Sequence, residues 1–68
     1  MDTINTFLKQ YNEVFDAGGA VKLCGRDTCK KLMLNASKIK PGIDYGNMDS
    51  GFMNIEAIKE LYNSLETN

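Results

Sequence analysis

Apolar residues recur at three- and four-residue intervals in three stretches of this 68-residue chain. Such spacing places side chains on one face of an α-helix. The pattern predicts helices over residues 3–16, 27–38 and 55–66. Residues typical of helix ends flank all three stretches. They are Asp2 or Thr3, Asp27 or Gly25, and Asn54 as N-caps, and Gly18–Gly19 and Pro41–Gly42 as stops.

The apolar faces of the three predicted helices match one another well enough to form a single core. In the first helix Phe7, Tyr11 and Phe15 make an aromatic stripe, which we interpret as core or dimer seam. We expect one shared core that contains Phe7, Leu8, Tyr11, Leu32, Met33, Ile58 and Leu65.

The segments between the predicted helices contain short stretches that can form a small sheet. Residues 20–23 alternate weakly, which predicts a short strand paired with 43–45 or 51–53, or else an extended loop. Glycines and a proline in residues 40–53 predict an ordered loop with turns. Its apolar residues Ile43, Tyr45, Met48 and Phe52 are expected to lie on the core. The predicted fold is mainly α: a small three-helix domain over residues 1–68. The sequence leaves open whether a minor two-stranded β element is added to it.

Length and composition limit the broad class of the protein. A chain this short buries a small share of its surface, so self-association is a natural supplement to its stability. The longest apolar runs fall far short of the roughly 20 residues that span a bilayer. The N-terminal residues lack the apolar region of a signal peptide. We therefore expect a cytoplasmic protein with no membrane partner. Abundant Asn and Lys indicate AT-rich coding, as in a bacterium or its phages.

Two cysteines, Cys24 and Cys29, lie among basic residues in a chain without histidine. A structural zinc site needs four ligands, usually cysteine or histidine, and a redox pair usually has C-x-x-C spacing. Neither pattern is present. Cys29 also falls on the apolar face with Leu32 and Met33, where free cysteine behaves as a small hydrophobe. We expect two free thiols, no metal and no cofactor.

Other motifs are weak. The stretch from Cys24 to Lys31 lacks the spacing of a phosphate loop, and residues 44–56 fail the register of a calcium loop. No histidine is present to serve as a base, and the carboxylates are scattered. We expect no enzymatic activity.

Charge is unevenly distributed along the chain. Six of the eight basic residues lie within residues 22–40, where Asp27 is the single acid. Leu34 is expected in the middle of the basic side of the second helix, away from the core. Asymmetry of this kind can mark a binding face, although a charged face is often only solvated. The candidate partner-binding residues are Arg26, Lys30, Lys31, Leu34 and Lys38.

The sequence is compatible with two functions. The first is a small non-enzymatic protein-interaction or regulatory module that forms a homodimer and binds a protein partner through exposed apolar positions such as Leu34. The alternative is a small nucleic-acid-associated regulator that contacts phosphates weakly through the basic second helix. Salt dependence would separate them, because phosphate contacts release counterions.

Overall fold

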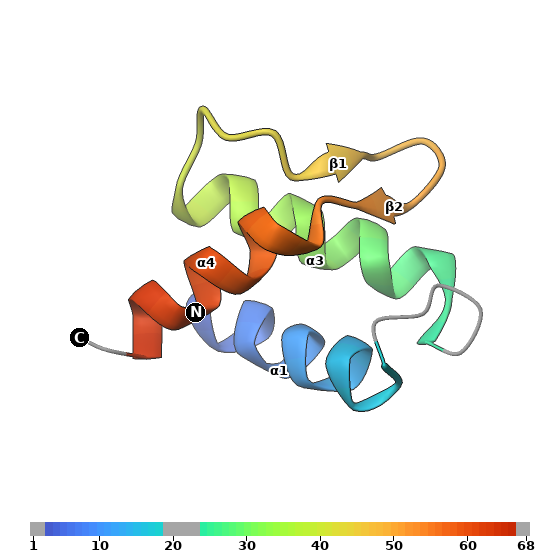
Figure 1. The fold of residues 1–68 in the computed structure, drawn as a ribbon, viewed down its shortest axis with the longest axis horizontal. Coiled ribbons are helices and arrows are strands. Elements are labelled where there is room, and N and C mark those ends of the chain that lie inside the picture. Colours follow the sequence, from blue (N-terminus) through green and yellow to red (C-terminus); the bar gives the residue numbers. More distant parts are fainter. Residues whose placement is uncertain (1–2, 19–23, 67–68) are drawn as a thin grey trace.

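Three helices and one hairpin make up the fold in the computed structural model, which describes residues 3–18 and 24–66 (Figure 1). The helices are α1 (Thr3–Asp16), α3 (Arg26–Ile39) and α4 (Ile55–Glu66). The hairpin pairs β1 (Gly46–Asn47) with β2 (Phe52–Met53) in antiparallel fashion. The prediction of a mainly α domain is confirmed, and each helix begins and ends within one residue of its predicted bounds.

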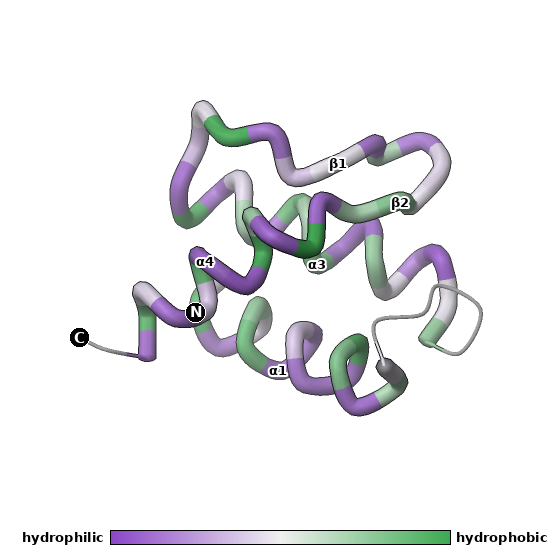
Figure 2. The backbone as a smooth tube through the Cα atoms, in the orientation of Figure 1, coloured by the Kyte–Doolittle hydropathy of each residue, from purple (hydrophilic) through white to green (hydrophobic). Residues whose placement is uncertain are grey.

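Helix α3 is the central element, packed against α1, α4 and strand β2. Apolar and polar stretches alternate along the helices (Figure 2). The predicted core is confirmed: Phe7, Leu32, Met33 and Ile58 are fully buried, and the other three predicted residues pack at its margin. The buried apolar residues are Phe7, Val14, Cys29, Leu32, Met33, Ala36, Tyr45, Ile58 and Leu61.

The aromatic stripe of α1 connects this helix with α4. Tyr11 stacks on Tyr62 with ring centroids 3.8 Å apart, and on Phe15 at 4.2 Å. Phe7 lies 6.4 Å from Tyr11 in a tilted arrangement. Offset or tilted ring pairs add to the free energy gained by burial alone. The stripe is therefore part of the core and of its α4 margin.

Local hydrogen bonds set the helix ends. Gly18 adopts a positive φ of 75°, and its N–H donates to the Phe15 carbonyl at 3.0 Å, as at many helix C-termini. Gly25 occupies the N-cap position of α3, without a side-chain cap. The Asn54 Oδ1 accepts a hydrogen bond from the Ala57 N–H at 3.3 Å, which confirms Asn54 as the cap of α4.

The hairpin confirms the two-stranded element, and one of its strands, β2, lies within the predicted segment 51–53. Its partner is Gly46–Asn47, whereas residues 43–45 form no strand, and the predicted strand at 20–23 lies outside the described residues. Asn47 closes the turn, because its Oδ1 accepts from the N–H groups of Asp49 and Ser50. Gly46 is required there: its φ is 125°, and an added Cβ would overlap the Phe52 carbonyl oxygen.

The loop before the hairpin is fixed by Tyr45, which is 4% exposed and donates its hydroxyl to the Lys40 carbonyl at 2.7 Å. Ile43 also packs against the core. The prediction was wrong for Met48 and Phe52, which are 38% and 69% exposed. Met53, the other residue of β2, is half-buried and packs against the core, whereas Phe52 faces outward.

Candidate interaction surface on helix α3

Helix α3 has two faces of different chemistry. Its inner face is fully buried and consists of Cys29, Leu32, Met33 and Ala36. Its opposite side is exposed to solvent and carries Asp27, Lys31, Leu34 and Lys38. No polar or charged side chain is buried within residues 3–18 and 24–66, so the charges of α3 lie on the surface or at its edge.

The structure brings three of the five predicted partner-binding residues together on this exposed side. Lys31 precedes Leu34 by three residues and Lys38 follows it by four, which places one lysine about a helical turn away in each direction. Leu34 is 47% exposed, as predicted. We call Lys31, Leu34 and Lys38 the outer face of α3.

The other two predicted residues lie apart from the outer face. Lys30 is half-buried, at the border with the core side. Arg26 is exposed at the start of α3, about two turns before Leu34, and its side chain lies against the hairpin turn. A Cβ added at Gly51 would meet Arg26 Cγ at 2.5 Å, so Arg26 and Gly51 are in close contact.

Part of the charge placement on α3 stabilises the helix itself. Asp27 lies in the first turn and Lys38 in the last, where each charge opposes the helix dipole. This role does not extend to Lys31 or Leu34, which lie in the middle of the helix. The side chains of Lys31 and Lys38 are both exposed.

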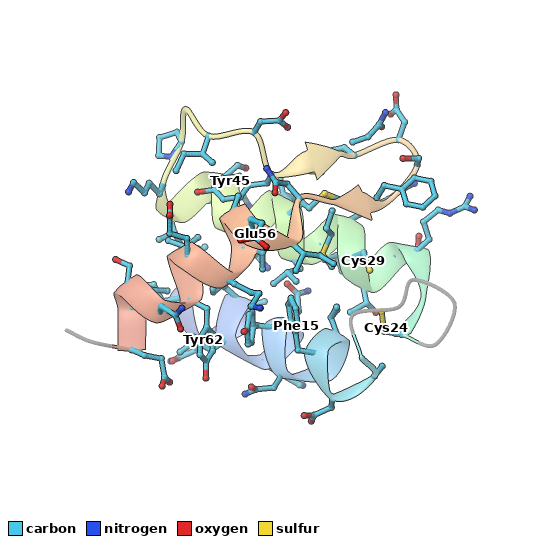
Figure 3. All side chains as sticks on the ribbon, viewed as in Figure 1. Phe15, Cys24, Cys29, Tyr45, Glu56 and Tyr62 are labelled. Atoms are coloured by element: carbon cyan, nitrogen blue, oxygen red, sulfur yellow. The ribbon has the colours of Figure 1, made fainter. Side chains whose placement is uncertain are left out.

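Acidic side chains lie on another part of the surface. Glu56 and Glu60 are exposed on α4, and Glu56 projects from the first turn of that helix (Figure 3). Lys59 is the basic residue between them. The described surface thus separates a basic α3 from a more acidic α4, although the net charge of the whole chain is only −1.

The two cysteines lie at the N-terminal end of α3 (Figure 3). Their sulfurs are 3.5 Å apart and share a hydrogen bond, without a disulfide bond. Cys29 is fully buried and Cys24 is half-buried. Burial, together with the hydrogen bond and charge of Cys24, raises the pKa of the Cys29 thiol to about 11. No group of three or more potential metal ligands occurs among the residues that the structure describes.

Sequence patterns missed the exposed apolar residues outside α3. Phe52 on the hairpin is 69% exposed, and Ile55 at the start of α4 is 41% exposed. Ile55 belongs to the apolar stripe of its helix but lies in the first turn, beyond the reach of the core. No local pattern marks Phe52 as exposed, because β2 contains only Phe52 and Met53.

Comparisons of this chain with protein-family models, with curated proteins and with solved structures find no match. In the part of the chain that the structure describes, no helix is both long and apolar enough to traverse a bilayer.

Proposed function

We propose that this protein is a non-enzymatic interaction module whose outer face binds an acidic segment of a partner protein. The observation that carries the proposal is the 47% exposure of Leu34, one helical turn from Lys31 and from Lys38. An apolar centre between two cations complements a segment in which an apolar side chain is flanked by carboxylates. The apolar contact would supply affinity, and the two charges would supply orientation.

A nucleic-acid partner is the rival interpretation of the same face. Lys31 and Lys38 can contact phosphates as point charges, but lysine lacks the fork with which arginine reads guanine. Leu34 would contribute nothing to such a contact. The outer face also carries no aromatic residue on which a base could stack. The leucine at its centre therefore favours a protein partner over a polyanion.

The experiment compares two probes at low salt by fluorescence anisotropy. One probe is a peptide with a leucine flanked by glutamates, and the other is a short DNA duplex. We expect the peptide to bind and Leu34→Ser to weaken it about tenfold, since burial of one apolar side chain contributes about 1.5–3 kcal/mol. If only DNA binds, with a steep salt dependence and no effect of Leu34→Ser, the nucleic-acid alternative replaces this proposal.

A matched pair of charge reversals separates the outer face from net charge. Lys31→Glu/Lys38→Glu changes the outer face, while Lys9→Glu/Lys59→Glu makes the same change in net charge at exposed positions of α1 and α4. We expect the first pair to abolish peptide binding and the second to leave most of it. Equal losses would mean that overall charge, not the outer face, controls binding.

We also propose that the chain forms a homodimer, through a different surface. A two-fold contact at the outer face would bring the lysines of one copy close to the lysines of the other, which is unfavourable. Phe52 and Ile55 offer exposed apolar area three residues apart. Sedimentation equilibrium should show a dimer that Phe52→Ser converts to monomer and Leu34→Ser leaves intact. A monomer at all concentrations would rule the dimer out.

A further inference from the structure

We propose that Cys24 and Cys29 form a dithiol site that reacts with low-molecular-weight disulfides, such as oxidised glutathione, and closes to an intramolecular disulfide. The proposal is independent of the outer face of α3. It assigns a modification site to a pair of residues for which the interaction function has no use.

The first support is the distance between the two sulfurs. Cys24 Sγ and Cys29 Sγ lie 3.5 Å apart, in hydrogen-bond contact. A disulfide bond is about 2.05 Å long, so the sulfurs need to approach by about 1.5 Å. Gly25, with a φ of 93°, follows Cys24 directly and can adopt backbone conformations that other residues rarely adopt.

The second support is the unequal exposure of the two thiols. Cys24 is half-buried, whereas Cys29 is fully buried among the core residues of α3. A dissolved disulfide can reach Cys24 but not Cys29. The pair therefore has one sulfur that meets the reagent and a second sulfur that is held next to the first.

A metal ion is a poorer occupant of this site. Two thiolates are half of the four ligands of a structural zinc site, and no cluster of three potential ligands exists within residues 3–18 and 24–66. Disulfide formation needs only the pair.

The reaction consists of two exchanges that balance. Cys24 Sγ, as thiolate, attacks one sulfur of the low-molecular-weight disulfide, and the other sulfur leaves and takes up a proton as the first free thiol. Cys29 then loses its proton, and its Sγ attacks Cys24 Sγ, so that the second small thiol leaves and is protonated. The two protein thiols are oxidised by two electrons, and one small disulfide is reduced to two thiols.

The environment of Cys29 makes the second exchange the slower one at neutral pH. In the reduced chain burial is the largest cause that raises the pKa of Cys29 to about 11. The smaller contribution of the Cys24 thiol ends once Cys24 carries the mixed disulfide, and burial remains. The charged residues nearest in sequence are Arg26 and Lys30 on α3 and, with opposite sign, Asp27. Since the thiolate is the nucleophile, a mixed disulfide on Cys24 should accumulate transiently at neutral pH and close faster as the pH rises.

The test treats the reduced 68-residue chain with oxidised glutathione and follows intact mass under non-reducing conditions. We expect a monomer that has lost two hydrogen atoms and retains no glutathione, with closure accelerating between neutral pH and about pH 9. Cys29→Ala should stop at the glutathione adduct, and Cys24→Ser should stay unmodified. A permanent adduct on the natural chain, a disulfide-linked dimer as main product, or fast modification of Cys24→Ser would each overturn the proposal.

Two measurements use the unsubstituted chain, so their results do not depend on whether the variants fold. Limited alkylation followed by peptide mapping should label Cys24 before Cys29, and the reverse order would refute the assignment of roles. The oxidised protein should melt about 5–15 °C higher than the reduced protein, because a bridge over a short loop removes freedom from the unfolded chain. A melting temperature lowered by oxidation would show that the bridge distorts α3, and would count against Cys24 and Cys29 as a disulfide site.

Discussion

Leu32 and Leu34 are the same amino acid on the same helix, two positions apart, and their surroundings are opposite. Leu32 is fully buried on the inner face of α3, and Leu34 is 47% exposed on the outer face. The inner face joins α3 to the rest of the fold, while the outer face contacts no other part of the described core. The inner face therefore contributes to the stability of the fold, whereas the outer face is exposed to a partner. Matched substitutions at Leu32 and Leu34 can measure the effect on stability and the effect on binding separately.

The largest effect is expected from Leu32→Ala. A large-to-small change at a packed site costs about 2–5 kcal/mol of unfolding free energy, because it removes buried area and leaves a cavity. For a domain of this size that is a large part of the total stability. Urea unfolding followed by circular dichroism measures it. An unchanged midpoint would show that the inner face of α3 is not packed as described.

Alkaline pH should lower the free energy of unfolding, because Cys29 on the inner face of α3 loses its proton. The pKa of Cys29 is raised from 9.0 to about 11 in the folded protein, so the folded state holds this proton more tightly than the unfolded chain. The resulting stability is complete below pH 9 and is lost as the pH rises toward about 11. Burial also raises the pKa of Tyr45, which adds a loss in the same direction above pH 10.

Chemical denaturation at a series of pH values under reducing conditions tests this dependence. We expect a smaller loss than that caused by Leu32→Ala, beginning near pH 9. In Cys29→Ala the early part of the decline should disappear, while the later part from Tyr45 remains. A stability that is constant from pH 9 to pH 10 in the natural chain would contradict the assignment to Cys29.

Sequence patterns predicted the inner face of α3 better than its surroundings. Leu32, Met33 and Cys29 recur at helical spacing, and this repetition alone fixes which side of the helix is buried. The outer face followed as its complement, although the half-buried Lys30 lies at the border of the two sides. Periodicity succeeds where a long element is buried along one stripe.

The hairpin could not be predicted in the same way. Its strands contain two residues each, which is too short for alternation to be visible. They are held by turn chemistry, including the Asn47 side chain and the positive φ of Gly46. Phe52 was misplaced because hydrophobicity predicts burial only where an element presents the residue to a core. The exposed Phe52 and the contact of Arg26 with the turn depend on tertiary geometry, which no local pattern contains.

An intermediate effect is expected where the two faces of α3 meet. The half-buried Asn35 donates its Nδ2–H to Gln10 Oε1 at 2.6 Å, which links α3 to α1. Asn35→Ala should cost about 0.5–1.5 kcal/mol, the usual net contribution of one hydrogen bond. Gln10→Ala and the double variant complete a mutant cycle. A coupling energy of zero would show that the two amides do not interact in solution.

The smallest effect on stability is expected from Leu34→Ala, the counterpart of the first substitution. Leu34 is 47% exposed and belongs to no part of the buried cluster, so its removal should change the unfolding free energy by no more than about 0.5 kcal/mol. Alanine and leucine are both good helix formers, so α3 itself should be unaffected.

Since the chemical change is the same as in Leu32→Ala, any difference between the two variants reports the environment alone. Parallel urea titrations give that difference, and anisotropy with the acidic peptide shows whether Leu34→Ala loses binding while it keeps stability. A loss of stability comparable to that of Leu32→Ala would mean that the outer face is covered in solution, and would locate the homodimer contact on α3 instead of on Phe52 and Ile55.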